Sequence, residues 1–150
     1  MVKLIQIKGV LINDLQQIPH PKGDILHGMK NNDSGFNGFG EAYFSTIKTG
    51  VIKAWKKHNN MTLNLIVPIG AIRFVLFDER ENSKTHAHFN EIVLSKENYK
   101  RLTIPSGVWM GFQGLGKDIN MLLNIADIPH DPDEQTNISI ENSKINFSWI

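Results

Sequence analysis

The sequence is divided into short β-rich runs that recur at intervals of roughly ten residues, the spacing expected of a β-sandwich or β-barrel. No segment keeps apolar residues at helical spacing for three turns, which argues against a helical domain. The predicted strands cover residues 10–15, 42–48, 50–56, 62–67, 71–77, 90–94, 101–104, 108–113, 119–125, 138–140 and 145–150. Many short strands with little helix predict an all-β fold, an antiparallel jelly-roll barrel whose mouth is a natural ligand site.

Composition limits the chemistry and the partners of the chain. With 150 residues it can bury the core of one domain, and we expect a single domain over residues 1–150. The absence of cysteine excludes disulfides, thiolate nucleophiles and cysteine metal sites, and it is compatible with a reducing cytoplasm, where we place the protein. A net charge of +1 argues against a nucleic-acid partner. The most apolar stretch, residues 63–77, is too short and too interrupted to span a membrane.

Residues 1–40 are less regular than the rest of the chain. Residues 31–40 are rich in asparagine and glycine, which favour loops and positive φ angles over helix. We therefore expect an irregular N-terminal arm ahead of the barrel.

The run from Gly50 to His58 is the first candidate for chemistry. On a strand, Lys56 and His58 project to one face, whereas Trp55 and Lys57 project to the other. At a barrel mouth these residues would supply a cation and an imidazole to one pocket. The alternative is a solvated basic strand end, with His58 bonded to a surface partner.

The spacing of Gly50, Lys56, His58, Asn64 and Gly70 resembles the first cupin motif, and residues 104–112 resemble the second. Metal-binding cupins use two histidines and a carboxylate from the first motif and a histidine from the second. Here the corresponding positions read Lys56, His58, no carboxylate in the expected window, and Met110. A protonated ammonium cannot ligate a metal, and a thioether is a poor ligand for hard ions. We predict no catalytic metal and no cofactor.

Within the cupins the closer resemblance is to the dTDP-4-dehydrorhamnose 3,5-epimerases. It rests on the shared order and spacing of residues 40–45, 50–58, 77–80 with Ser83 and Thr85 after them, 94–98, 104–112, 126–134 and 145–149. The resemblance implies a metal-free reaction. A histidine oriented by an aspartate removes the proton beside the 4-keto group, and a tyrosine returns a proton on the other face.

Carried over position by position, the resemblance places the family's base on Lys56 and its preceding arginine on Lys53. The lysine near the enolate falls on Asn64, and the second-motif histidine falls on Met110. We expect Lys53 to contact phosphate, and Asn64 and Gln113 to hold substrate oxygens.

Two further positions depart from the family pattern. The proton-donating tyrosine falls on or near Ile128, and the orienting aspartate falls on Asn142, which we keep as a substrate-binding candidate. Isoleucine cannot transfer a proton, and Lys56 could act as a base only if its pKa were strongly lowered. His58 could replace it on the same strand face, so Lys56 and His58 are the catalytic candidates.

Three functions remain open on these residues. The first is an epimerase or isomerase that acts on a nucleotide-activated 4-keto sugar in bacterial surface-polysaccharide biosynthesis. The second is a non-catalytic cupin that binds a nucleotide sugar or another small anion, and the third is a dimerisation module. A tyrosine or carboxylate beside His58 would favour the first, and the candidates for it are Tyr43, Tyr99, Glu41 and Asp78.

Other segments are given structural interpretations. His86-Ala87-His88 and residues 130–134 are expected to be exposed turns. The tryptophans are expected in the core, although Trp109 borders the second motif and could stack on a ligand. By analogy with cupins of this size, we expect a homodimer in which residues 1–15 add a strand to the partner's sheet.

Overall fold

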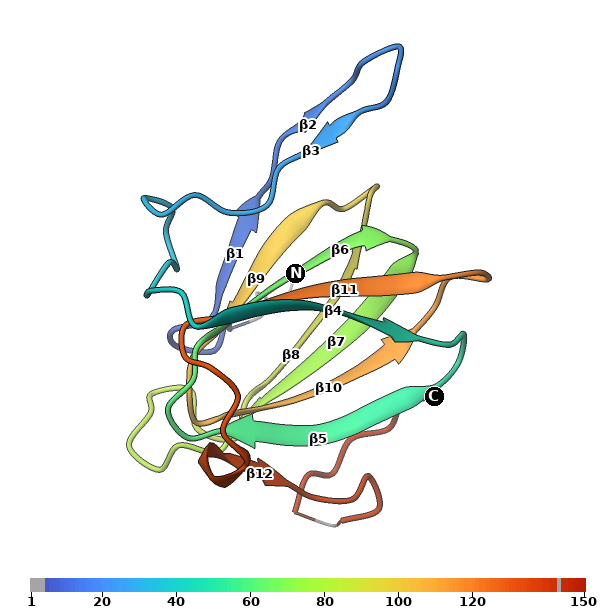
Figure 1. Cartoon of the computed structure of the whole chain (residues 1–150). Coiled ribbons are helices and arrows are strands. Elements are labelled where there is room, and N and C mark those ends of the chain that lie inside the picture. The colour runs from blue at the N-terminus through green and yellow to red at the C-terminus, as the bar shows by residue number, and fades with distance from the viewer. Residues whose placement is uncertain (1–4, 143) are drawn as a thin grey trace.

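The computed structural model describes residues 5–142 and 144–150 and consists of two facing antiparallel β-sheets (Figure 1). The first sheet has the order β1-β9-β6-β11-β4, and the second has the order β12-β5-β10-β7-β8. The strands of the first sheet are β1 (Leu11–Asp14), β9 (Lys100–Ile104), β6 (Leu63–Ile69), β11 (Asn120–Ala126) and β4 (Glu41–Ile47). Those of the second are β12 (Gln135–Asn137), β5 (Ile52–His58), β10 (Val108–Gly114), β7 (Ala71–Asp78) and β8 (Phe89–Ser95). The predicted all-β jelly-roll fold is confirmed.

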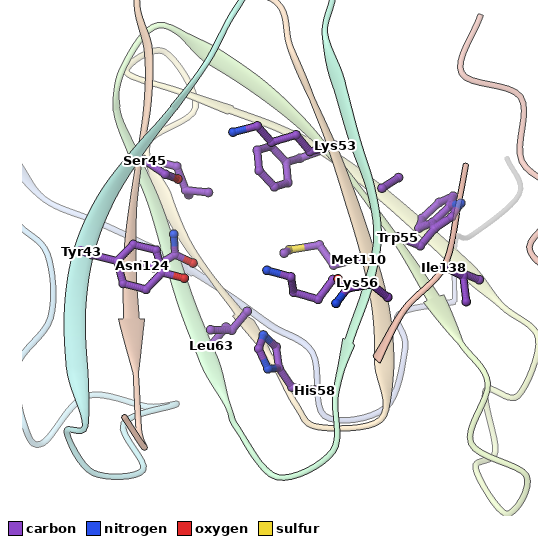
Figure 2. Close-up of a pocket in the computed structure, with 14 residues that line it drawn as sticks. Tyr43, Ser45, Lys53, Trp55, Lys56, His58, Leu63, Met110, Asn124 and Ile138 are labelled. Carbon is purple, nitrogen blue, oxygen red and sulfur yellow. The ribbon is translucent and has the colours of Figure 1, made fainter. Parts of the chain in front are cut away.

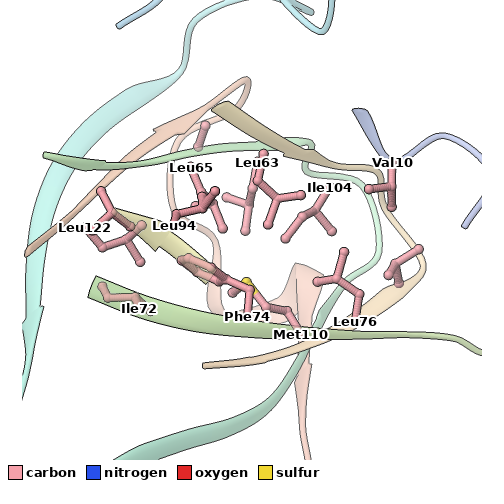
Figure 3. Packing of buried hydrophobic residues seen from close by; sticks show 14 of the residues in the cluster. Val10, Leu63, Leu65, Ile72, Phe74, Leu76, Leu94, Ile104, Met110 and Leu122 are labelled. Atoms are coloured by element: carbon pink, nitrogen blue, oxygen red, sulfur yellow. The ribbon is translucent and has the colours of Figure 1, made fainter. Parts of the chain in front are cut away.

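The core lies between the two sheets, where the inward-facing side chains of β6, β7, β9 and β10 are apolar. Leu63 and Leu65 of β6 meet Ile72, Phe74 and Leu76 of β7 across this layer (Figure 3). Alternate residues of these strands point to opposite faces, and the runs 65–67 and 74–76 are apolar throughout because both faces of the strands are covered there. Among the described residues, no helix is long and apolar enough to cross a membrane.

The strand predicted at residues 145–150, all of which the structure describes, is absent, and of residues 138–140 only Ile138 pairs with β5, through two backbone hydrogen bonds with Trp55 at 3.0 and 3.1 Å. The last strand is β12, which lies earlier in the chain and pairs with β5. After it, residues 144–150 run as irregular chain over the outer face of the second sheet, where Phe147 and Trp149 pack against Trp55. Their apolar pattern therefore reflects burial of aromatic side chains rather than pairing in a ladder.

An irregularity in β5 decides which of its side chains face inward. Met110 of β10 is opposite Lys56, but Phe112, two residues later, is opposite Lys53, three residues earlier. The extra residue in β5 makes a β-bulge, which changes the alternation of side chains along the strand. As a result Lys53 and Lys56 both line the space between the sheets, while Trp55 packs its ring on the outer face.

The N-terminal arm contacts the first sheet and then leaves it. Strand β1 pairs with β9 of the same chain, and a hairpin of β2 (Gln17–Ile18) and β3 (Ile25–Leu26) projects from the barrel (Figure 1). Residues 28–35 return over the outer face of the sheet. There Arg101 donates to the carbonyls of Gly28 and Ser34, each at 3.0 Å.

Candidate functional site

A cavity of about 390 Å³ opens between the two sheets on the side where β4 and β5 lie (Figure 2). Its apolar floor includes Leu63, Met110 and Phe112. Its polar side chains come from both walls and include Tyr43, Ser45, Lys53, Lys56, His58, Asn124 and Asn137. An apolar cavity with a few convergent polar groups is the usual form of a small-molecule site.

His58 is paired with a buried carboxylate. Its Nδ1 lies within hydrogen-bond distance of Oε1 of Glu134, and the two side chains have relative exposures of 12% and 4%. The other carboxylate oxygen, Oε2, accepts hydrogen bonds from the backbone N–H groups of Asn60 and Met61, each at 3.1 Å. Glu134 is therefore held in place from two sides and fixes the orientation of the imidazole ring. His58 is not at a solvated strand end.

The position of Glu134 follows from the local fold. A short 3₁₀ turn, η1 (Pro132–Glu134), begins at Asp131, whose side chain accepts a hydrogen bond from the N–H of Asp133. The chain then enters β12, where Gln135 is the ladder partner of His58. The residue before Gln135 is thereby brought beside the imidazole.

The pKa of Glu134 is lowered from its usual value. Burial by itself would raise it, but the hydrogen bonds from His58 and from the N–H groups of Asn60 and Met61 outweigh that effect. Glu134 is therefore an anion at neutral pH and can stabilise a positive charge on His58. A base whose ring is oriented by a carboxylate is a recurring arrangement for proton abstraction.

The wall opposite His58 is formed by β4 and β11. Tyr43 and Asn124 are ladder partners on these strands, and both side chains line the cavity (Figure 2). Burial, and then the negative charge of Glu41, raise the pKa of Tyr43. Its phenol is thus protonated at neutral pH and can donate a proton.

Two lysines give the cavity its positive charge. Lys56 makes no salt bridge with any residue that the structure describes, and its ammonium group lies between Met110 and His58 in the close-up (Figure 2). Lys53 is exposed at the opening, where its Nζ donates to the carbonyl of Thr46 at 3.0 Å. An anionic ligand would meet Lys53 first and Lys56 deeper inside.

Comparison with known proteins identifies the family. The model of the dTDP-4-dehydrorhamnose 3,5-epimerase family matches residues 5–150. The chain belongs to this family. It is 28% identical over 145 residues to the spore coat polysaccharide biosynthesis protein SpsL of Bacillus subtilis (strain 168), covering 95% of this chain and 96% of that protein. It is 27% identical over 134 residues to the probable low-salt glycan biosynthesis epimerase Agl13 of Haloferax volcanii, covering 86% of each.

Solved structures agree with this assignment. A dTDP sugar isomerase from Desulfovibrio desulfuricans G20 superposes with a TM-score of 0.92 at 38% identity, covering 95% of this chain and 92% of that one. A dTDP-6-deoxy-D-glucose-3,5-epimerase from Legionella pneumophila, solved with dTDP-4-keto-L-rhamnose, gives a TM-score of 0.79 at 19% identity over 92% of this chain and 77% of that one, and shows the shared fold.

The cavity contains four of the predicted site residues, namely His58, Lys56, Lys53 and Met110. The other three lie elsewhere. Asn64 faces the arm, where it donates to the carbonyl of Gly35 at 3.0 Å and accepts from the hydroxyl of Thr103 at 2.6 Å. Gln113 accepts from Arg73 at 3.4 Å, and Asn142 lies in an exposed turn where its Oδ1 accepts from the N–H of Lys144 at 2.9 Å.

The carboxylate beside His58 is not among the four candidates that the sequence suggested. Of these four, Tyr43 lines the cavity, whereas the hydroxyl of Tyr99 donates to the carbonyl of His27 at 2.7 Å. Residues 130–134 were expected to form an exposed turn, and Asp131 and Asp133 are indeed exposed. Glu134, however, is only 5% exposed, so the expectation is wrong for this residue. The one sequence feature that could have pointed to Glu134 is its place directly after a turn-forming Asp-Pro-Asp sequence.

The structure also shows where His86 and Trp109 lie. His86 is exposed, and its Nδ1 lies 3.0 Å from the carbonyl oxygen of Arg80 within the loop after β7. Trp109 is fully buried on the outer side of the second sheet, where its Nε1 donates to Glu79. It therefore does not line the cavity.

Proposed function

We propose that this protein is a sugar-nucleotide epimerase that inverts a carbon beside the keto group of a nucleotide-activated 4-keto sugar, in the biosynthesis of a bacterial surface polysaccharide. The observation that carries the proposal is the buried His58–Glu134 pair in a cavity that also holds a lysine and a tyrosine on different walls. Its relatives in polysaccharide and glycan biosynthesis support the same conclusion.

His58 acts as the base. Because Glu134 accepts a hydrogen bond from Nδ1–H, Nε2 carries the free lone pair and takes the proton from the carbon next to the keto group. The electron pair of the broken C–H bond moves into the carbonyl and forms an enolate. The ammonium group of Lys56 stabilises the enolate oxygen, and the Glu134 carboxylate stabilises the new imidazolium.

Tyr43 returns a proton to the opposite face of the same carbon. It belongs to the other sheet and is protonated at neutral pH, as its raised pKa indicates. Transfer of its phenolic proton re-forms the C–H bond with inverted configuration, after which both groups return to their starting states by exchange with water. Ile128, on or near which the resemblance places the family's tyrosine, packs against the apolar core and supplies no proton.

Lys53 contacts the diphosphate of the substrate. It is exposed at the opening of the cavity, where a charged group can keep part of its hydration. This orientation places the nucleotide outside and the sugar between the sheets.

The test is incorporation of deuterium from D₂O into a panel of 4-keto nucleotide sugars, including dTDP-4-keto-L-rhamnose. Wild-type protein should incorporate deuterium and change the configuration, and His58→Ala should abolish both. Tyr43→Phe should still exchange the proton that His58 removes but should not invert the carbon. Binding without any exchange by the wild type would contradict catalysis.

That outcome would instead support the second function, a non-catalytic binder of nucleotide sugars. What favours it is that the resemblance places the family's base on Lys56, which carries an ammonium group instead of an imidazole. Under this alternative Lys56→Ala and His58→Ala weaken binding and no exchange is seen in any variant.

We further propose that the protein is a cytoplasmic homodimer. Support for the dimer comes from the outer face of the first sheet, where Phe44 is 63% and Ile69 48% exposed. The projecting β2–β3 hairpin is a second surface that a partner could cover (Figure 1). The predicted exchange of an N-terminal strand stays a proposal, since β1 lies on β9 of its own chain and residues 1–4 fall outside the described part.

A further inference from the structure

Asn124 has a polar amide side chain, although its neighbours on the same face of β11 are apolar and buried in the core. It lies on β11 between Leu122 and Ala126, which point the same way and are 1% and 0% exposed in the apolar core. Alternation along a strand places all three on the inner face of the first sheet. An apolar residue would be the ordinary choice at this position.

The side chain of Asn124 is 5% exposed and makes no hydrogen bond to any described residue, and its amide atoms are not among the enclosed polar atoms without a partner, so the small exposed part of the side chain is its amide end in the cavity. Other buried amides differ from it. Asn120, four residues earlier, accepts from the N–H of Ala71 at 3.0 Å and of Gly116 at 2.9 Å, and it donates to the carbonyl of Ile47 at 3.2 Å. The amide of Asn124 has no such protein partners in the described part of the chain, so in the cavity it is free to hydrogen-bond to water or to a ligand.

The amide of Asn124 is directed into the cavity. It appears beside Tyr43 on the wall facing Lys56 and His58 (Figure 2). Its polar atoms are therefore available to a ligand that fills the cavity, while the protein leaves them without a partner of their own.

We propose that Asn124 is a specificity-determining residue that recognises the sugar of the substrate, its NH₂ group donating to one sugar oxygen and its carbonyl accepting from a neighbouring hydroxyl. This inference rests on the proposed function. An amide offers both a donor and an acceptor, which matches the adjacent oxygens of a hexose. It carries no charge to match a diphosphate, and the exposed cation at the opening is Lys53.

The proposal predicts opposite effects on stability and on binding. Leucine has the same number of heavy atoms as asparagine and the same branching at Cγ, its larger methyl groups can extend into the cavity, and it suits the apolar row, so Asn124→Leu should keep or raise the Tm. The same change removes both hydrogen bonds to the sugar. Asn120→Leu is the matched control, because its amide is bonded to the backbone and its loss should lower the Tm.

The experiment is calorimetric titration of wild-type and Asn124→Leu protein with four ligands. These are dTDP, dTDP-4-keto-L-rhamnose, UDP and UDP-4-keto-L-rhamnose. We expect affinity for the sugar nucleotide to fall by about tenfold to a hundredfold, with the affinity for the nucleotide alone unchanged. Unchanged binding of the sugar nucleotide, equal losses for both ligands, or a lowered Tm would overturn the role of Asn124. If the wild type bound neither sugar nucleotide, the proposed function itself would fail, and this inference with it.

Discussion

At the scale of single residues, the chemistry of the cavity depends on how each polar group is paired. His58 and Glu134 are bonded to each other, Asn124 is bonded to no described residue, and Lys56 has no carboxylate partner among them. The first pair is arranged to move a proton, and the other two groups are free to meet a ligand. Carboxylate and amide side chains at other positions in this chain hydrogen-bond to nearby groups and stabilise loops and turns instead.

Replacement of Glu134 by glutamine should slow proton abstraction. The amide keeps acceptor capacity for the N–H groups of Asn60 and Met61 but carries no charge to stabilise an imidazolium. We expect the deuterium exchange rate to fall by about 10²- to 10⁴-fold with substrate affinity changed little. Asp133→Asn, one residue away and exposed, is the control and should exchange normally. Wild-type rates in Glu134→Gln would show that the carboxylate serves only to position the turn.

At the scale of elements, the loop after β7 is organised around Asp78. This carboxylate is 0% exposed and accepts hydrogen bonds from Arg80 Nε at 2.8 Å and from the hydroxyls of Ser83 and Thr85, each at 2.6 Å. Thr85 also accepts from the N–H of Lys8 at 3.0 Å, which attaches the N-terminal segment to the loop. The run Asp78–Thr85, which forms part of the family resemblance, is therefore explained by structure rather than by catalysis.

The loop should give the protein a stability that is lost in acid. Burial would raise the pKa of Asp78, but the hydrogen bonds from Arg80, Ser83 and Thr85 hold it well below its usual range. Because the folded-state pKa is below the unfolded value of about 4, the stabilisation is complete above that pH and declines as the pH falls through the folded-state pKa.

Asp78→Asn should therefore lower the free energy of unfolding at pH 7 by about 1.5–3 kcal/mol. Urea unfolding measured from pH 7 down to pH 2 checks this, and the difference from wild type should shrink as the pH falls. Asp118→Asn, on an exposed turn, should unfold like wild type at every pH. A difference between Asp78→Asn and wild type that stayed constant with pH would contradict an electrostatic origin.

At the scale of the whole molecule, the proposed dimer predicts a measurable mass. Light scattering behind size-exclusion chromatography should give about twice the 17.0 kDa of the chain. Phe44→Lys would introduce a charge on the exposed sheet face without touching the cavity, and it should shift the protein toward the monomer. A wild-type protein that runs as a monomer at micromolar concentration would contradict the dimer.

Much of the fold could be predicted from the sequence because the strand signal is local. The expected strands at residues 71–77 and 108–113 coincide with β7 and β10 to within one residue. The errors fall after Ile138, which still exchanges backbone hydrogen bonds with Trp55, and at residues 145–150, where Ile145, Phe147 and Trp149 pack on the second sheet as irregular chain. Apolar character shows that a segment is buried but does not show what pairs with its backbone.

For the site, the β-rich barrel, the family and the basic Lys53–His58 strand could be predicted from the sequence, because each of these depends on residues close together along the chain. The bulge in β5, the contact of Glu134 with His58, and the positions of Asn64 at the arm and Asn124 at the cavity depend on the folded arrangement of distant strands. His58 and Glu134 are separated by 76 residues. They meet because β12 pairs with β5, a long-range contact that no local pattern of residues records.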